Sequence, residues 1–262
     1  MNRLSVYILT HNEEAKIESA IKSVLWADDV VLVDSDSTDS TVSLAKGLGA
    51  RIVNVPFKGF GKLRNAAISA CIHDWIFSLD ADERCTDDVA SEIIKIIHEP
   101  DSLDAYFIPR RNWFLGRWIN YSGWYPDYRQ PQLFRRGAVL YWEEDEVHEG
   151  YDIKGTAGYL KNPIWQFPFK NLEQFQFKVN RYSSLGSHKL DRRGVRGSMA
   201  KAFAHGLAAF LHTYLLKRGF LDGWAGFVIA LGNFEGTFYR YVKLLEKQSI
   251  WEPSPKEIYF RR

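Results

Sequence analysis

The first hundred residues alternate between short apolar runs and segments whose apolar residues recur with helical spacing. The run from Val30 to Val33 is continuously apolar, which is typical of a strand buried on both faces. Residues 14–26 instead place Ile17, Ile21 and Val24 on one side of a helix. Strands are predicted at residues 4–10, 29–34, 51–55 and 75–79, and helices at 14–26, 40–48, 62–71 and 86–98. The alternation predicts an α/β fold with a mostly parallel sheet covered on both faces.

The pattern changes after Pro100. Shorter strands are predicted at residues 106–110, 132–136 and 139–142, with an aromatic-rich loop at 113–124. From Asn171 onward the spacing predicts helices only, at residues 173–190, 198–216 and 221–247. We therefore expect a domain of residues 1–170, divided near residue 100, followed by a helical region of residues 171–262.

Composition narrows the possible partners. Residues 1–170 hold 19 Lys and Arg against 25 Asp and Glu, whereas residues 171–262 hold 15 against 7. The acidic residues 1–170 could bind a divalent cation. The basic residues 171–262 could bind a phosphate-rich surface, or they could simply form helices with a solvated basic side. The two cysteines have no metal-binding spacing. Met1 leads directly into a strand-like run without a secretory signal, so a cytoplasmic location is expected.

Three predicted strands are followed by polar clusters, at the strand ends where parallel α/β sheets bind ligands. The clusters are Thr10-His11-Asn12-Glu13-Glu14, the acidic run of residues 34–39, and Leu79-Asp80-Ala81-Asp82. Helix capping can account for Asp39 or Ser40, but it does not require Asp34 and Asp36 as well. We interpret those two carboxylates as acceptors for a nucleobase or ribose.

The third cluster predicts a metal site. Two carboxylates one residue apart, Asp80 and Asp82, can serve one hard cation, and Mg²⁺ commonly combines one or two carboxylates with substrate phosphates. Bound Mg²⁺ or Mn²⁺ would stabilise a diphosphate as a leaving group.

Together, these clusters and residues 59–65 resemble the family-2 glycosyltransferases of the GT-A fold. The resemblance implies a UDP-hexose donor and divides residues 1–170 into a nucleotide-binding half and an acceptor half. It implies that Thr10, Glu13, Asp34 and Asp36 surround the nucleoside, that Arg64 and Asp80 lie near the nucleotide and sugar, and that Asp82 binds the metal. One position departs from the family pattern, because Asp36 stands where glycine is expected.

Sugar transfer with inversion needs a base that deprotonates the attacking hydroxyl. We nominate Glu149 as this base, with His148 as an orienting or substitute base and Asp127 and Asp145 in reserve. The four consecutive acids at residues 143–146 are more typical of a solvated loop.

Residues 123–127, 132–136, 147–149 and 219–224 resemble a narrower subgroup, the lipopolysaccharide core glucosyltransferases of Gram-negative bacteria. That resemblance implies glucose transfer from UDP-glucose to an inner-core heptose. We nominate Trp124, Asp127 and Arg135 on the acceptor side. Sugar stacking and core packing remain equal alternatives for the aromatic residues Trp113, Trp118, Trp124 and Tyr125. Arg129, Arg135 and Arg136 are either contacts for an anionic acceptor or diphosphate, or solvated side chains.

Two apolar stretches in the helical region, residues 202–216 and 220–234, are shorter than the roughly twenty residues that span a bilayer. Flanking basic residues favour a peripheral position on the inner face of the cytoplasmic membrane. The alternative is a helix pair packed on the catalytic domain with a basic exposed side. We expect a lipid-linked saccharide acceptor and no nucleic acid. Two other functions remain open: a polyprenyl-phosphate glycosyltransferase, and a nucleotide-binding scaffold without turnover.

Overall fold

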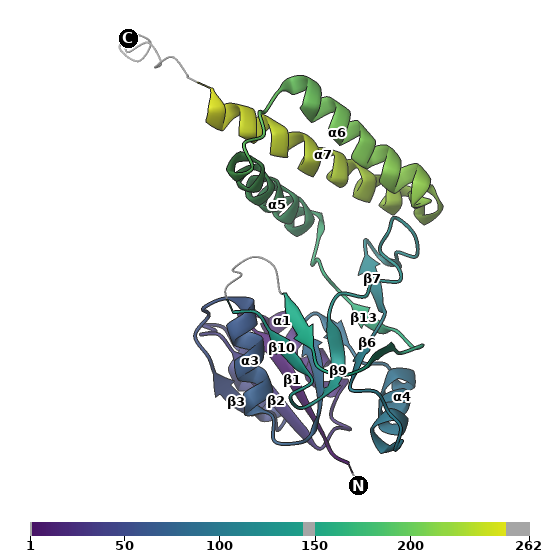
Figure 1. The fold of residues 1–262 in the computed structure, drawn as a ribbon. Coiled ribbons are helices and arrows are strands. Elements are labelled where there is room, and N and C mark those ends of the chain that lie inside the picture. Colours follow the sequence, from purple (N-terminus) through teal and green to yellow (C-terminus); the bar gives the residue numbers. More distant parts are fainter. Residues whose placement is uncertain (1, 144–149, 250–262) are drawn as a thin grey trace. The chain divides into compact units, whose positions relative to one another are not determined.

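The computed structural model describes residues 2–143 and 150–249. The chain forms two compact units (Figure 1). The first comprises residues 1–120 and 124–168, and the second comprises residues 121–123 and 169–262.

The first unit is built on a seven-stranded sheet. Its strand order is β12-β6-β9-β4-β1-β2-β3. The strands are β1 (Leu4–Thr10), β2 (Asp29–Asp34), β3 (Arg51–Asn54), β4 (Trp75–Asp80), β6 (Ala105–Phe107), β9 (Pro131–Arg135) and β12 (Ala157–Tyr159). β1, β2, β3 and β4 are mutually parallel, and β9 is antiparallel to its neighbours β4 and β6. The predicted mostly parallel α/β sheet is confirmed.

Helices cover both faces of this sheet. The helices are α1 (Glu14–Lys22), α2 (Thr41–Gly47), α3 (Phe60–Ala70) and α4 (Asp87–His98). Successive residues of β1 point to opposite faces. Val6 and Ile8 therefore join the core that α1, α2 and α4 complete, whereas Tyr7 and Leu9 join the core completed by α3.

Two smaller sheets flank the central one. One has the order β5-β13-β7-β8, and the other pairs β10 with β11. Their strands are β5 (Glu83–Arg84), β7 (Arg110–Phe114), β8 (Arg117–Trp118), β10 (Val139–Tyr141), β11 (Tyr151–Ile153) and β13 (Ile164–Gln166). The predicted strand at residues 106–110 is two strands, because β6 ends at Phe107 and β7 begins at Arg110.

The second unit is helical. Its elements are α5 (Leu172–Arg192), α6 (Met199–Leu211), the π-helical turn η1 (His212–Leu216), the 3-10 turn η2 (Gly219–Asp222) and α7 (Gly223–Gln248). The side chains of Asn171 and Ser198 cap α5 and α6 by accepting from the backbone N–H groups of Gln174 and Lys201. No helix in the described part of the chain is long and apolar enough to cross a membrane.

A close backbone contact holds α3 in place and supplies a test of the packing. A Cβ at Gly61 would lie 1.9 Å from the carbonyl oxygen of Trp142, whereas one at Gly47 in α2 would meet nothing within 4 Å. Gly61→Ala should therefore lower the free energy of unfolding by about 1–3 kcal/mol through overpacking. Gly47→Ala should be neutral or slightly stabilising. Urea unfolding followed by circular dichroism measures both, and equal stability of the two variants would contradict the packing described here.

Candidate active site

Three polar strand ends lie side by side at one edge of the central sheet. β1 pairs in parallel with β2 on one side and with β4 on the other. Thr10 is in register with Asp34, and Leu9 is in register with Asp80. Neighbouring strands are about 5 Å apart, so the ends of the three strands form a row. Thr10 and Asp34 lie on one face of the sheet, whereas Asp80, level with Leu9, lies on the other face, where α3 packs. This row lies at the carboxyl edge of the parallel strands, where ligands bind in α/β sheets.

The loops that follow β1 and β2 are tied together by hydrogen bonds. The Asn12 backbone N–H donates to Ser37 Oγ at 2.9 Å, and the Thr38 N–H donates to Asn12 Oδ1 at 2.8 Å. The Glu13 N–H donates to Thr41 Oγ1 at 2.9 Å. These bonds hold the two loops together and position the backbone of Glu13 after the end of β1.

Asp34 organises its own loop. It is 3% exposed and accepts hydrogen bonds from the backbone N–H of Ser37 at 3.0 Å and from Ser37 Oγ at 2.5 Å. A carboxylate has about four acceptor positions, so Asp34 keeps capacity for a ligand donor. Beside it, Thr10 Oγ1 is buried and has no hydrogen-bond partner among the described residues.

Asp36 occupies a position that favours glycine. Its φ of 56° lies in the left-handed region, which aspartate tolerates better than most side chains because of its short polar group. Aspartate at position 36, in place of the glycine of the family pattern, therefore adopts the left-handed backbone conformation that glycine favours. The Asp36 side chain is exposed, in contrast to the buried Asp34.

Arg64 connects α3 to the end of β4. Its guanidinium is 3% exposed, donates to Ser78 Oγ at 3.2 Å and to Asp80 Oδ1 at 3.3 Å, and lies 5.5 Å from the centroid of the Tyr141 ring. The Asp80 side chain is 31% exposed. The observed contacts of Arg64 therefore hold the Asp80 carboxylate while leaving part of it open to solvent.

A buried network below the Asp80–Asp82 turn was not predicted. Glu83 is fully buried and accepts from Arg110 Nε at 2.5 Å, from Gln132 Nε2 at 2.9 Å and from the Asp80 N–H at 3.0 Å. Burial raises the pKa of Glu83, Arg110 opposes this increase, and the nearby Asp80 and Asp82 add to it. Arg110 is 27 residues away in sequence, so only the sheet order β5-β13-β7, which brings β7 near β5, reveals the pair.

The surroundings of Asp82 suit a cation completed by substrate oxygens. Its carbonyl accepts from the Phe167 N–H at 2.8 Å, and its carboxylate lies 3.5 Å from Gln166 Nε2. The buried Gln166 Oε1 has no hydrogen-bond partner in the described part of the chain, so an amide oxygen is available beside the carboxylate. Within residues 2–143 and 150–249, no three His, Cys, Asp or Glu side chains form a metal-binding group. Mg²⁺ bound by one or two carboxylates and phosphates needs no such group.

Asp127 lies beside the Glu83 network, and Trp124 contacts β7, the strand that carries Arg110. Arg110 forms a β-bridge with Asp127, and its Nη1 lies 3.4 Å from the Asp127 carbonyl oxygen. The Asp127 carboxylate forms an ion pair with Arg129 at 2.7 Å. The Trp124 carbonyl accepts from Asn112 Nδ2 at 3.0 Å, and its ring packs 5.5 Å from Phe114.

Arg135 lies at the opposite end of β4 from the acids. Antiparallel pairing places it beside Trp75, and its guanidinium covers that ring at 4.5 Å. The five steps along the strand from Trp75 to Asp80 rise about 16 Å. Arg136 also lies at that end of β4, where its guanidinium donates hydrogen bonds to the carbonyls of Cys71 and His73. These contacts place Arg135 and Arg136 at the end of β4 away from Asp80, and the acceptor role of Arg135 stays a prediction.

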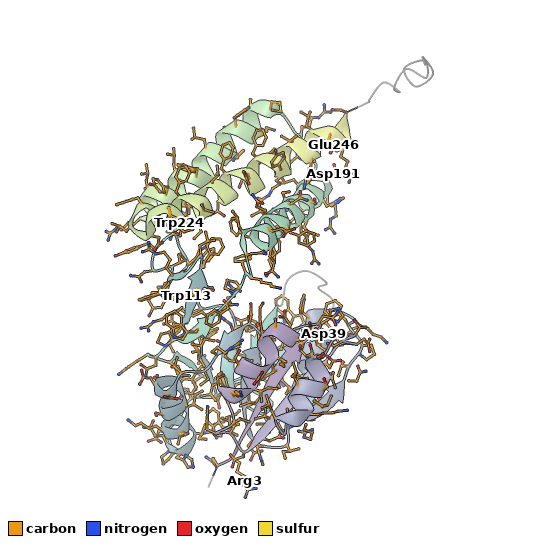
Figure 2. All side chains as sticks on the ribbon, turned by 180° about the vertical axis from the view of Figure 1, so that it is seen from behind. Arg3, Asp39, Trp113, Asp191, Trp224 and Glu246 are labelled. Carbon is orange, nitrogen blue, oxygen red and sulfur yellow. The ribbon has the colours of Figure 1, made fainter. Side chains whose placement is uncertain are left out.

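Three nominated residues, Asp145, His148 and Glu149, lie outside the described residues. Three of the four aromatic alternatives fall in one cluster, where Trp118 packs edge-on against Tyr125 and Trp165, and Trp113 packs against Trp165. Trp113, labelled in Figure 2, remains 38% exposed.

The fold and the acidic sheet edge define a nucleotide-sugar transferase of the GT-A type. A sequence model of the family described as Glycosyl transferase family 2 matches residues 5–166, and the chain belongs to this family. It is thus a glycosyltransferase.

Relatives and a solved structure agree with this assignment. An uncharacterized glycosyltransferase of Rickettsia typhi, RT0209, is 30% identical over 94% of this chain and 88% of the relative. The lipopolysaccharide core biosynthesis glycosyltransferase LpsC of Rhizobium meliloti is 26% identical over 94% of this chain and 93% of LpsC. The crystal structure of S. aureus TarS 1–349 in complex with UDP-GlcNAc has the same fold, with a TM-score of 0.51 at 16% identity, covering 94% of this chain and 91% of TarS.

The buried ion pair predicts the effect of removing one partner. Glu83→Gln leaves the Arg110 charge buried without its counter-ion and should lower the free energy of unfolding by about 3 kcal/mol. The double variant Glu83→Gln/Arg110→Met removes both charges and should be more stable than the single variant. Denaturant unfolding of the three proteins checks this, and a single variant as stable as the parent chain would show that the pair does not support the turn.

Proposed function

We propose that this glycosyltransferase moves a hexose, glucose from UDP-glucose, with inversion to a hydroxyl of a lipid-linked saccharide such as the lipopolysaccharide inner core. The observation that carries the donor site is the row of polar strand ends of β2, β1 and β4, which places Asp34 and Thr10 beside the end of the strand that carries Asp80. The acceptor class is supported by the relative named for lipopolysaccharide core biosynthesis. TarS, which shares the fold, was crystallised with a UDP-sugar, which supports the donor class.

In this proposal the nucleoside lies over the joined loops after β1 and β2. Thr10 offers a buried hydroxyl without a partner among the described residues, and Asp34 has acceptor capacity beyond its two bonds to Ser37. Glu13 is half-buried and ion-paired with Lys16 at 3.5 Å. Asp36 is exposed on the same loop as Asp34 and is the more accessible of the two carboxylates.

Asp82, with Asp80 beside it, would hold Mg²⁺ or Mn²⁺. The cation, when bound, would neutralise charge on the diphosphate and so make UDP a better leaving group. Arg64 orients Asp80, and Gln166 lies against Asp82. Glu83 accepts a hydrogen bond from the Asp80 backbone N–H and so holds the turn that carries both carboxylates.

The acceptor hydroxyl needs a base on the side of the sugar opposite the leaving group. The oxygen of the acceptor hydroxyl forms the new bond to the anomeric carbon, and the base takes the hydroxyl proton. The bond from the anomeric carbon to the diphosphate breaks, and UDP leaves with the electron pair. We assign this role to Glu149, with His148 orienting it, on sequence grounds. Trp124 and Asp127 are proposed on the acceptor side.

The proposal divides the chain by role. Residues 1–100 bind the nucleotide, residues 101–170 bind the acceptor, and the basic residues 171–262 associate with the inner face of the cytoplasmic membrane. A polyprenyl-phosphate glycosyltransferase is the second candidate, because the same donor site would serve it. A phosphate acceptor is already ionised and needs no base.

Loss of the Asp82 carboxylate tests the metal assignment. Asp82→Asn should reduce metal-dependent release of UDP from UDP-glucose by about a hundredfold or more, because a carboxylate ligand is lost beside the diphosphate. EDTA should abolish release by the parent chain. Asp101→Asn, at an exposed position on the loop after α4, is the matched control and should keep the parent rate. A full rate for Asp82→Asn would refute its role as ligand.

Replacement of the proposed base separates the two acceptor classes. Glu149→Gln should slow transfer to a hydroxyl acceptor by about 10²–10⁴-fold, because general-base catalysis is removed. The dissociation constant for UDP with Mn²⁺, measured by calorimetry, should stay at the parent value. Unchanged transfer by this variant would instead favour a phosphate acceptor.

A further inference from the structure

An apolar surface runs along α6 and η1 in the second unit. Its five large side chains recur at intervals of four residues, so they form one stripe on the helix. They are Met199 (45% exposed), Phe203 (56%), Leu207 (53%), Leu211 (41%) and Leu215 (52%). The opposite side of α6 is buried through the small residues Ala202 and Gly206, and Gly206 lies against Phe234 of α7.

The stripe continues over the last residue of η1, η2 and the first half of α7. The exposed side chains there are Leu216 (75%), Phe220 (47%), Leu221 (48%), Trp224 (62%), Phe227 (45%) and Leu231 (40%). The rings of Phe210 and Tyr214, which belong to α6 and η1, contact Phe227. The two sets of side chains are thus joined, and we call them together the α6–α7 apolar face. Figure 2 shows Trp224 at one end of the helix pair, with Asp191 and Glu246 toward the other.

The charges on this face have one sign. Between residues 202 and 234 the only Asp, Glu, Lys or Arg residues are Lys217, Arg218 and Asp222. Asp222 is 1% exposed, and its carboxylate accepts from the Tyr121 N–H and from Ser122 Oγ at 2.7 Å. Lys217 and Arg218 are exposed and lie directly after Leu216, the most exposed residue of the face. The solvent-facing charge of this stretch is therefore entirely positive.

We propose that the α6–α7 apolar face inserts into the headgroup region of an anionic bilayer, with the helices lying along the membrane surface. Contiguous apolar patches larger than a few hundred Å² mark interaction sites on soluble proteins. No described helix is long and apolar enough to cross a membrane, and the proposed position at the depth of the headgroups requires no crossing. Trp and Phe suit the membrane interface, and Lys217 and Arg218 match acidic headgroups. This inference deepens the proposed function, on which it rests for the lipid-linked acceptor, by naming the surface that meets the lipid.

Vesicle co-sedimentation of the full chain tests the proposal. The parent chain should bind vesicles of phosphatidylethanolamine and phosphatidylglycerol more tightly than vesicles of phosphatidylcholine. The triple variant Phe203→Gln/Leu207→Gln/Trp224→Gln should bind the anionic vesicles about tenfold or more weakly, because buried apolar area sets the binding of interfacial helices. Lys217→Glu/Arg218→Glu should lose the preference for anionic vesicles.

A matched control replaces exposed apolar residues of the first unit, Leu25, Ile72 and Ile94, by Gln. It should bind vesicles as the parent chain does. Circular dichroism confirms that each variant is folded, and UDP release from UDP-glucose without lipid should be equal in all of them. Vesicle binding by a chain that does not transfer or hydrolyse the sugar nucleotide would contradict the proposed function and still support the α6–α7 apolar face as the membrane-binding surface.

Two results would overturn the proposal. One is equal vesicle binding by the parent chain and the triple variant. The other is a parent chain that is dimeric by light scattering without lipid and becomes monomeric in the triple variant, because the face would then join two copies of the chain.

Discussion

Parallel pairing of β1 with both β2 and β4 is the constraint on which the candidate site depends. The pairing is in register, so Thr10 ends level with Asp34 on one side and Leu9 is level with Asp80 on the other. Three loops therefore leave the sheet at one edge. Adjacent residues of β1 point to opposite faces, so Asp34 and Thr10 lie on one face of this edge and Asp80 lies on the other, beside Arg64 of α3.

Carboxylates gathered at one edge repel one another, and the surrounding residues compensate. Arg64 lies against Asp80, and Arg110 forms a buried ion pair with Glu83. Arg84 adds a third cation, and its pKa is lowered by desolvation while Asp82, Glu13 and Glu83 act to raise it. A bound divalent cation would complete this balance at the exposed side of the turn.

Much of this arrangement could be predicted from one sequence. Continuous apolar runs mark buried parallel strands, and the polar residues after them fall at the ligand-binding edge of such a sheet. The short strands β11, β12 and β13 were missed because three residues show no periodicity. Glu83, Arg110 and Gln166 were missed because their partners come together only through the β5–β13–β7 pairing. The antiparallel direction of β9, which places Arg135 beside Trp75, is not visible in the residues of β9.

In the proposed function, Asp82 and the strand ends beside it bind a cation-bridged sugar nucleotide. A crystal structure of the chain with UDP and Mn²⁺, with the anomalous signal of the metal recorded, tests this most directly. The account predicts an anomalous peak at about 2.2 Å from a carboxylate oxygen of Asp82, a distance usual for such metal–oxygen bonds, with the uridine over Thr10 and Asp34. A metal and nucleotide bound elsewhere, with the Asp82 carboxylate free of both, would contradict it.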